Sequence, residues 1–277
     1  MGDRGYFPRG ESVLRRVHEE RIVGVLYGQR ALLLQAMHPI AFDGLMQDTR
    51  GLDAPFRRLV RTAKTMESIF FGTCAEADRV AAAVRRRHEQ VPAAGEQEHL
   101  LWILACLADS ALTVHQRFIG RLSREENESY WRDYLVLGEL FDLRPASAPP
   151  DFGAFKTYMR ERLASSELHV TPRARQIATA VAFDLPVPPD RRPALAVINH
   201  AIVGTLPPRA REEYGLSWGL VDELRLGALT MALRTSAAVL PRTLWIGSSA
   251  RDYDVVARGE ERRIARGDTP RLATEAF

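Results

Sequence analysis

The chain has 277 residues, of which 46% are hydrophobic and 26% charged, and its formal net charge is +3. This composition excludes a disordered protein, and the scattered basic residues form no block with interleaved aromatics, so we do not expect nucleic-acid binding. Cys74 and Cys106 provide neither a disulfide framework nor a zinc motif, and residues 1–16 lack the apolar run of a secretory signal. The longest apolar run, 100–114, is interrupted by Asp109 and is too short to span a bilayer, so we expect a soluble, cytoplasmic protein.

Apolar residues recur at helical spacing through most of the chain, and neither an alternating strand pattern nor an internal repeat is present. We therefore predict an all-α protein with a single multi-helix domain. Residues 1–10 are expected to form an N-terminal arm, residues 11–247 the domain, and residues 248–277 a charged, partly ordered tail.

The first predicted helices run from residue 11 to His38 and end in a Leu-rich segment that is apolar on nearly all sides. Such a segment is expected to be deeply buried. Pro39 ends or kinks the helix directly after His38. The imidazole of His38 therefore lies at a helix end, where it either faces a cavity or interacts with the helix dipole.

Two helices joined at Gly72 and Thr73 are predicted for residues 53–91. Asp53 is a plausible N-cap of the first helix, and Gly72 suits its C-terminal end. Arg61, Lys64 and Thr65 stand at positions i, i+3 and i+4, so their side chains share one patch.

A solvated basic face is the simplest interpretation of that patch. Composition adds a second one, because 36 of the 38 basic residues are Arg and only Lys64 and Lys156 are Lys. Unlike a guanidinium, a desolvated amine can lose its proton and act as a base or a metal ligand.

The second helix begins with a capping-box pattern, Thr73 to Glu76. An imidazole replaces an aliphatic residue in its apolar stripe, which contains Ala77, Val80, Ala81, Val84, His88 and Val91, and Arg85 lies one turn before His88. A lone His in such a stripe is either a hydrogen-bonded core residue or a ligand, since neutral imidazole is a common ligand of metals, haem iron included.

Further helices are predicted near 98–119, 124–141, 152–164, 172–183, 193–205 and 219–240, with a linker at 144–150. Ser123 and Glu126 form a second capping box, and His115 is expected to be half-exposed. Asn199 and His200 form a polar pair in an apolar helix. We interpret His200 as an unassigned core histidine for which a place in a pocket stays open.

Six blocks of the chain together resemble the MpaB-type oxygenase family, which includes the latex clearing proteins, or rubber oxygenases. The resemblance covers roughly residues 15–240, and the blocks match in order and spacing. They are RALLLQAMHP at 30–39, RTAKT at 61–65, FGT at 71–73, RRRH at 85–88, residues 101–117, and EEYGLSW at 212–218.

The resemblance implies an all-helical fold like the latex clearing protein core, with a b-type haem. His88 would then be the proximal iron ligand, and Lys64 would lie on the distal side, able to ligate iron in a closed state. Arg61 and Thr65 would line the dioxygen and substrate side. Arg85 and His38 belong to matching blocks near the cofactor, where His38 either faces the pocket or braces it.

These assignments predict a haem-dependent oxygenase that acts with dioxygen on a small apolar substrate, prenylated or terpenoid, by oxidative C=C cleavage. Two alternatives stay open. One is a non-haem metal or cofactor-free enzyme of the same fold, with His38, His88 and His200 around a metal or substrate. The other is a non-catalytic helical binding module, in which the Arg61, Lys64 and Thr65 patch would be open to solvent.

Overall fold

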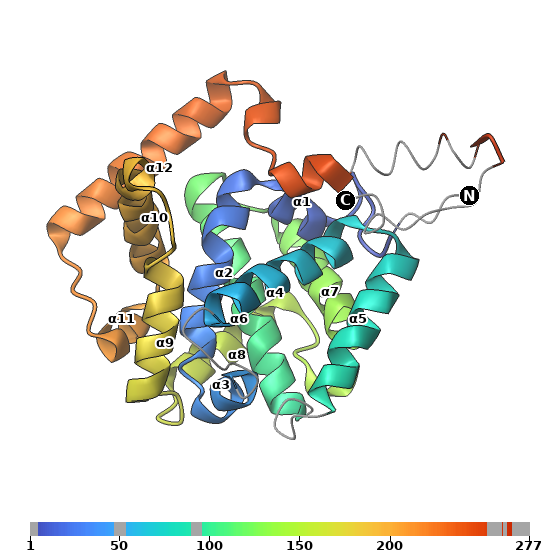
Figure 1. The fold of residues 1–277 in the computed structure, drawn as a ribbon, viewed down its shortest axis with the longest axis horizontal. Coiled ribbons are helices and arrows are strands. Elements are labelled where there is room, and N and C mark those ends of the chain that lie inside the picture. The colour runs from blue at the N-terminus through green and yellow to red at the C-terminus, as the bar shows by residue number, and fades with distance from the viewer. Residues whose placement is uncertain (1–4, 47–53, 90–95, 254–261, 263–264, 268–277) are drawn as a thin grey trace.

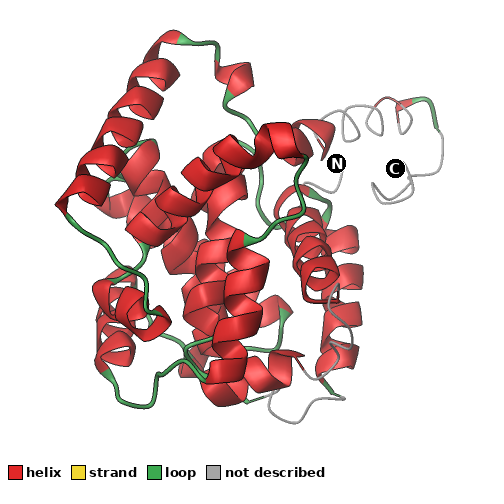
Figure 2. Cartoon of the chain, turned by 60° about the vertical axis from the view of Figure 1, so that its left-hand side comes forward, coloured by secondary structure: helices red, strands yellow, loops and turns green. Residues whose placement is uncertain are grey.

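The structure, a computed structural model, describes residues 5–46, 54–89, 96–253, 262 and 265–267. These residues form helices and no β-sheet, which confirms the predicted all-α class (Figures 1 and 2). Their α-helices are α1 (Val13–Glu19), α2 (Arg21–Gln35), α3 (Pro39–Met46), α4 (Ala54–Phe71), α5 (Cys74–His88), α6 (Gln97–Phe118), α7 (Arg124–Leu140), α8 (Phe152–Ala164), α9 (Pro172–Phe183), α10 (Arg192–Thr205), α11 (Pro208–Tyr214) and α12 (Leu220–Val239). Short 3-10 turns are η2 (Pro145–Ser147), η3 (Pro189–Arg191) and η4 (Arg242–Leu244).

Helices α2 and α6 form the centre of the domain and share its most extensive helix contact. Both are rich in apolar residues, and the Leu-rich end of α2 is buried as its composition predicts. Around this pair, α1, α4, α5 and α7 lie on one side, and α9, α10, α11 and α12 lie on the other (Figure 1). Within the described helices, none combines the length and the apolar character needed to cross a bilayer.

A buried ionic network joins the two central helices. The Arg30 guanidinium of α2 lies 3.0 Å from the Asp109 carboxylate of α6 and donates to the Ser110 hydroxyl at 2.8 Å. Lys156 reaches the other Asp109 oxygen at 3.2 Å. Burial raises the pKa of the Asp109 carboxyl, but the Arg30 and Lys156 cations outweigh burial and lower it below its ordinary value. The residue that interrupts the apolar run of α6 is therefore an anion held by two cations.

Several predicted helix ends are confirmed within a residue or two. The Ser123 side chain accepts from the Glu126 N–H, and the Glu126 carboxylate accepts in return from the Ser123 N–H, which completes the predicted capping box of α7. Pro39 begins α3 directly after His38. Asp53, the predicted N-cap of α4, lies outside the described residues.

The environment of one residue, His115, differs from the prediction. His115 is buried, with 6% of its surface exposed, instead of half-exposed. Burial lowers the pKa of His115 to about 4, so its imidazole is neutral.

Residues 248–253, at the start of the predicted tail, are helical, and Tyr253 packs against Phe71 at the end of α4.

Candidate functional site

The turn between α4 and α5 is built as the sequence predicts. A Cβ on Gly72 would lie 2.3 Å from the Ser68 carbonyl oxygen, so only glycine fits where α4 ends. Thr73 then caps α5, because its hydroxyl accepts from the Glu76 N–H at 3.2 Å. The Ser68 hydroxyl bonds to the Lys64 carbonyl and to the Tyr253 hydroxyl, so residues 248–253 hold the end of α4.

His88 is the last residue of α5 and lies on its inward face. It follows Ala77, Ala81 and Val84 at helical spacing; both alanines are fully buried, and Val84 and His88 are half-buried. The predicted apolar stripe is therefore present as far as His88, and Val91 lies outside the described residues. Its predicted role as an iron ligand stays a prediction.

The patch on α4 faces more to the outside. Arg61 and Lys64 are exposed and Thr65 is half-buried, whereas Met66 and Ile69 on the following turn are buried. The i, i+3, i+4 spacing brings the three side chains onto one side of α4. An exposed patch is the arrangement expected for a non-catalytic module. The distal role of Lys64 and the substrate-side roles of Arg61 and Thr65 stay predictions.

Arg85 ties the end of α5 to the end of α7. Its guanidinium donates to the Leu140 carbonyl at 2.6 Å and lies 3.6 Å from the Asp142 carboxylate. These contacts fix the last turn of α5, and with it the position of His88. They give Arg85 a positioning role, while its predicted contact with a cofactor stays a prediction.

His38 braces the junction of α2 and α3. Its Nδ1 accepts from the Ala41 N–H at 3.3 Å, and its ring packs edge-on against His99 of α6, with centroids 4.8 Å apart. Burial and the neighbouring His99 lower the pKa of His38 below its ordinary value. The neutral ring can accept a hydrogen bond, so one of the two predicted roles, bracing, is what its contacts provide.

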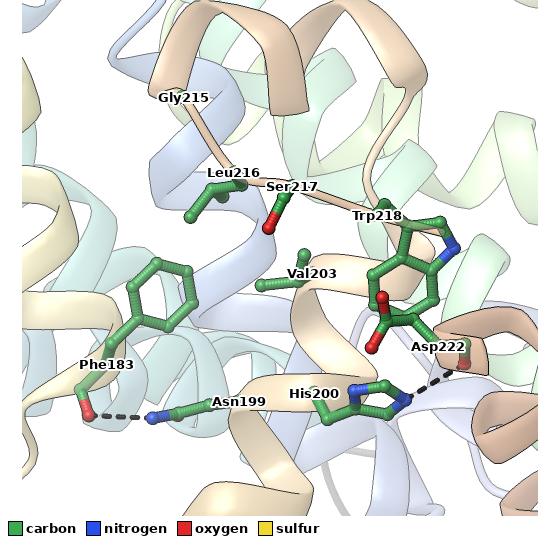
Figure 3. A pocket seen from close by; sticks show the side chains of 9 residues that line it. All are labelled: Phe183, Asn199, His200, Val203, Gly215, Leu216, Ser217, Trp218 and Asp222. Atoms are coloured by element: carbon green, nitrogen blue, oxygen red, sulfur yellow. Dashed lines mark hydrogen bonds between the residues drawn. The ribbon is translucent and has the colours of Figure 1, made fainter. Parts of the chain in front are cut away.

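A pocket of about 350 Å³ lies between the end of α9, α10 and the loop that leads into α12 (Figure 3). Part of its wall is Gly215, Leu216, Ser217 and Trp218, which belong to the 212–218 block. The other lining residues are Phe183, Asn199, His200, Val203 and Asp222. His200, unassigned from the sequence, thus faces a pocket.

Several polar groups of this pocket form hydrogen bonds or ring contacts with other residues that line it. The His200 ring lies over Trp218 with centroids 4.8 Å apart, and its Nε2 lies 3.1 Å from the Asp222 carbonyl oxygen. The Asn199 amide donates to the Phe183 carbonyl, while its buried Oδ1 has no hydrogen-bond partner in the described part of the chain. The sequence could not place this pocket, because its walls come from residues 183 to 222 and meet only through tertiary packing.

The pocket and His88 are separate sites. In Figure 1, α10 and α12 lie at one edge of the molecule, and α5 lies at the other, with α2 and α6 between them. Among the described residues, no three His, Cys, Asp or Glu side chains converge to hold a metal ion. The alternative in which His38, His88 and His200 surround one metal is therefore not the arrangement found.

A family model described as "ER-bound oxygenase mpaB/B'/Rubber oxygenase, catalytic domain" matches residues 15–235. The chain belongs to this family. The mpaB/rubber oxygenase match confirms the resemblance and covers α4, α5 and the pocket around His200. It makes the chain an oxygenase-type catalytic domain. Comparison with curated proteins and with solved structures gives no match.

One donor group of the α4–α5 hairpin suits the haem that the family resemblance implies. Haem iron needs one imidazole from the protein, and His88 offers one from an inward apolar stripe. Lys64 offers an amine from the neighbouring helix, but from an exposed position. The residue types therefore suit a single-histidine haem site.

Proposed function

We propose that the chain is a haem-dependent oxygenase that acts with dioxygen on a small apolar substrate. The observation that carries the proposal is the match of residues 15–235 to an oxygenase catalytic domain, with His88 of that region on the inward face of α5. When bound, haem would supply two kinds of chemistry that protein side chains lack, namely reaction with dioxygen and one-electron transfer. A prenylated or terpenoid molecule cleaved at a C=C bond is the substrate class that the family resemblance suggests.

The protein groups have distinct roles in this proposal. His88 would hold the cofactor through its imidazole, and the Arg85 contacts with α7 fix the turn that carries it. Lys64 would offer the iron a second nitrogen donor. Arg61 would supply a positive charge for an anionic group of the substrate or of reduced oxygen, and Thr65 would offer a hydroxyl donor nearby.

A second function is favoured by one observation. Arg61 and Lys64 are exposed, as a non-catalytic binding module with a solvated basic patch requires. Such a module takes up no haem, so one spectrum separates the two functions.

The test is an absorption titration of the purified chain with haem. The oxygenase proposal predicts saturable 1:1 uptake with a sharp Soret band. Replacing Lys64 by Ala should change the resting spectrum without loss of haem, while Lys156→Ala, the control at the other lysine, should leave it as in the wild type. An absence of saturable uptake contradicts the proposal, and an unchanged Lys64→Ala spectrum removes Lys64 from the iron.

A further inference from the structure

The outer face of α12 is apolar and exposed along the whole helix. Leu220, Val221, Leu224, Met231 and Val239 are 77%, 59%, 65%, 70% and 78% exposed. The opposite face packs against α10 and α6, and Leu226 is the one residue of α12 that is fully buried. Figures 1 and 2 show α12 at the edge of the domain. A helix with apolar residues on two opposite faces normally has both of those faces covered.

The residues of this face follow a heptad pattern. They alternate at spacings of three and four and are Val221, Leu224, Ala228, Met231, Thr235 and Ala238, all of them exposed. None is charged, and Arg225 and Arg234 lie at the edges of the face. This is the a and d spacing by which one helix packs against another in a coiled coil.

The area suits a protein partner. The exposed side chains of α12 listed above present a larger apolar area than the isolated apolar residues that a monomer usually exposes, as a protein interface does. The area alone does not identify the partner, but the order of residue sizes along α12 does.

That order is self-complementary. In an antiparallel pair of α12 helices, a positions face d positions, so one register sets Val221 opposite Ala238, Leu224 opposite Thr235, and Ala228 opposite Met231. Each large side chain meets a small one, and a two-fold axis passes between residues 229 and 230. We propose that the chain forms a two-fold homodimer in which α12 packs antiparallel against α12 of a second copy.

The first test is sedimentation of the full chain at micromolar concentrations. The wild type should sediment as a dimer, and Leu224→Glu or Met231→Glu should raise the dissociation constant about 100-fold, because each buries unpaired carboxylates at the seam. Val136→Glu, at an exposed apolar position of α7, is the matched control and should leave the constant unchanged. A wild type that stays monomeric, or a dimer insensitive to both seam variants, overturns the proposal.

The second test reports the register. Leu224→Cys and Thr235→Cys variants, mixed and oxidised, should give a disulfide-linked dimer, whereas Leu224→Cys alone should give no more cross-linking than the wild type. Efficient cross-linking of Leu224→Cys with itself would mean parallel pairing and overturn this arrangement. The arrangement would also be overturned if the chain stayed monomeric and bound, through α12, to vesicles of phosphatidylcholine and phosphatidylserine in a flotation assay. Lipid would then cover the face.

Discussion

His18 is a buried imidazole between α1 and its neighbours. Its ring stacks on Phe70 with centroids 4.2 Å apart, and its Nε2 lies 2.8 Å from the Tyr134 hydroxyl. Burial lowers the pKa of His18 to about 3, and repulsion from His115, once that ring is protonated in acid, adds to the effect. The folded protein therefore keeps His18 neutral at pH values at which the unfolded chain protonates it.

This residue predicts a loss of stability in acid. Between about pH 6.5 and 3 the unfolded chain binds the proton and the folded one does not, so the free energy of unfolding falls by up to about 1.4 kcal/mol per pH unit as pH decreases. His18→Phe should reduce that slope, with His115 and His38 supplying the remainder. Urea unfolding at pH 7 and pH 5 measures it, and an equal slope in the variant would contradict this role.

At the same scale, spacing along a helix predicts which side chains share a face but not what covers that face. The inward position of His88 could be predicted, because its apolar stripe is long. For Lys64 the sequence left a solvated face and a site both open, because the patch lies beside the buried stripe of α4 and tertiary packing decides its exposure. His200 lines the pocket together with Trp218, which lies 18 positions later in the chain, so spacing along one helix could not predict their contact.

The packing of α2 against α6 depends on the ion pair between Arg30 and Asp109. Each charge is almost fully buried, with side chains 2% and 8% exposed, so each requires the other. The Arg30 Nε also donates to the Thr205 carbonyl at the end of α10, which connects a third helix to the pair. The sequence predicted the apolar faces of these helices, but a buried ion pair between residues 79 positions apart has no local signal.

Asp109→Ala should therefore be severely destabilising. It leaves the Arg30 guanidinium buried without its counter-ion, at a cost of about 3–5 kcal/mol in the free energy of unfolding. Glu223→Ala, which removes the partly exposed pair with Arg117, is the control and should cost no more than about 1 kcal/mol. Urea denaturation of both variants gives the two values. A similar loss in both would mean that the buried network stabilises no more than a surface pair.

For the whole molecule, the fold follows from the pattern of helices, because long periodic segments with clear caps leave little choice of element type. The way those helices pack together decides where the candidate functional groups lie. Packing separates His88 from the pocket beside His200, and it leaves one apolar face of α12 uncovered within a single chain. Family membership then indicates an oxygenase. The haem site proposed above depends on His88.

The most direct measurement is a haem titration of His88→Ala beside the wild type and His169→Ala. His169 is exposed, so its replacement removes an imidazole without touching the α4–α5 hairpin. The wild type and His169→Ala should bind haem with the same affinity and the same Soret band, while His88→Ala should lose the band and bind at least about tenfold more weakly. A His88→Ala protein with the wild-type spectrum and affinity would contradict the assignment of His88 as the iron ligand.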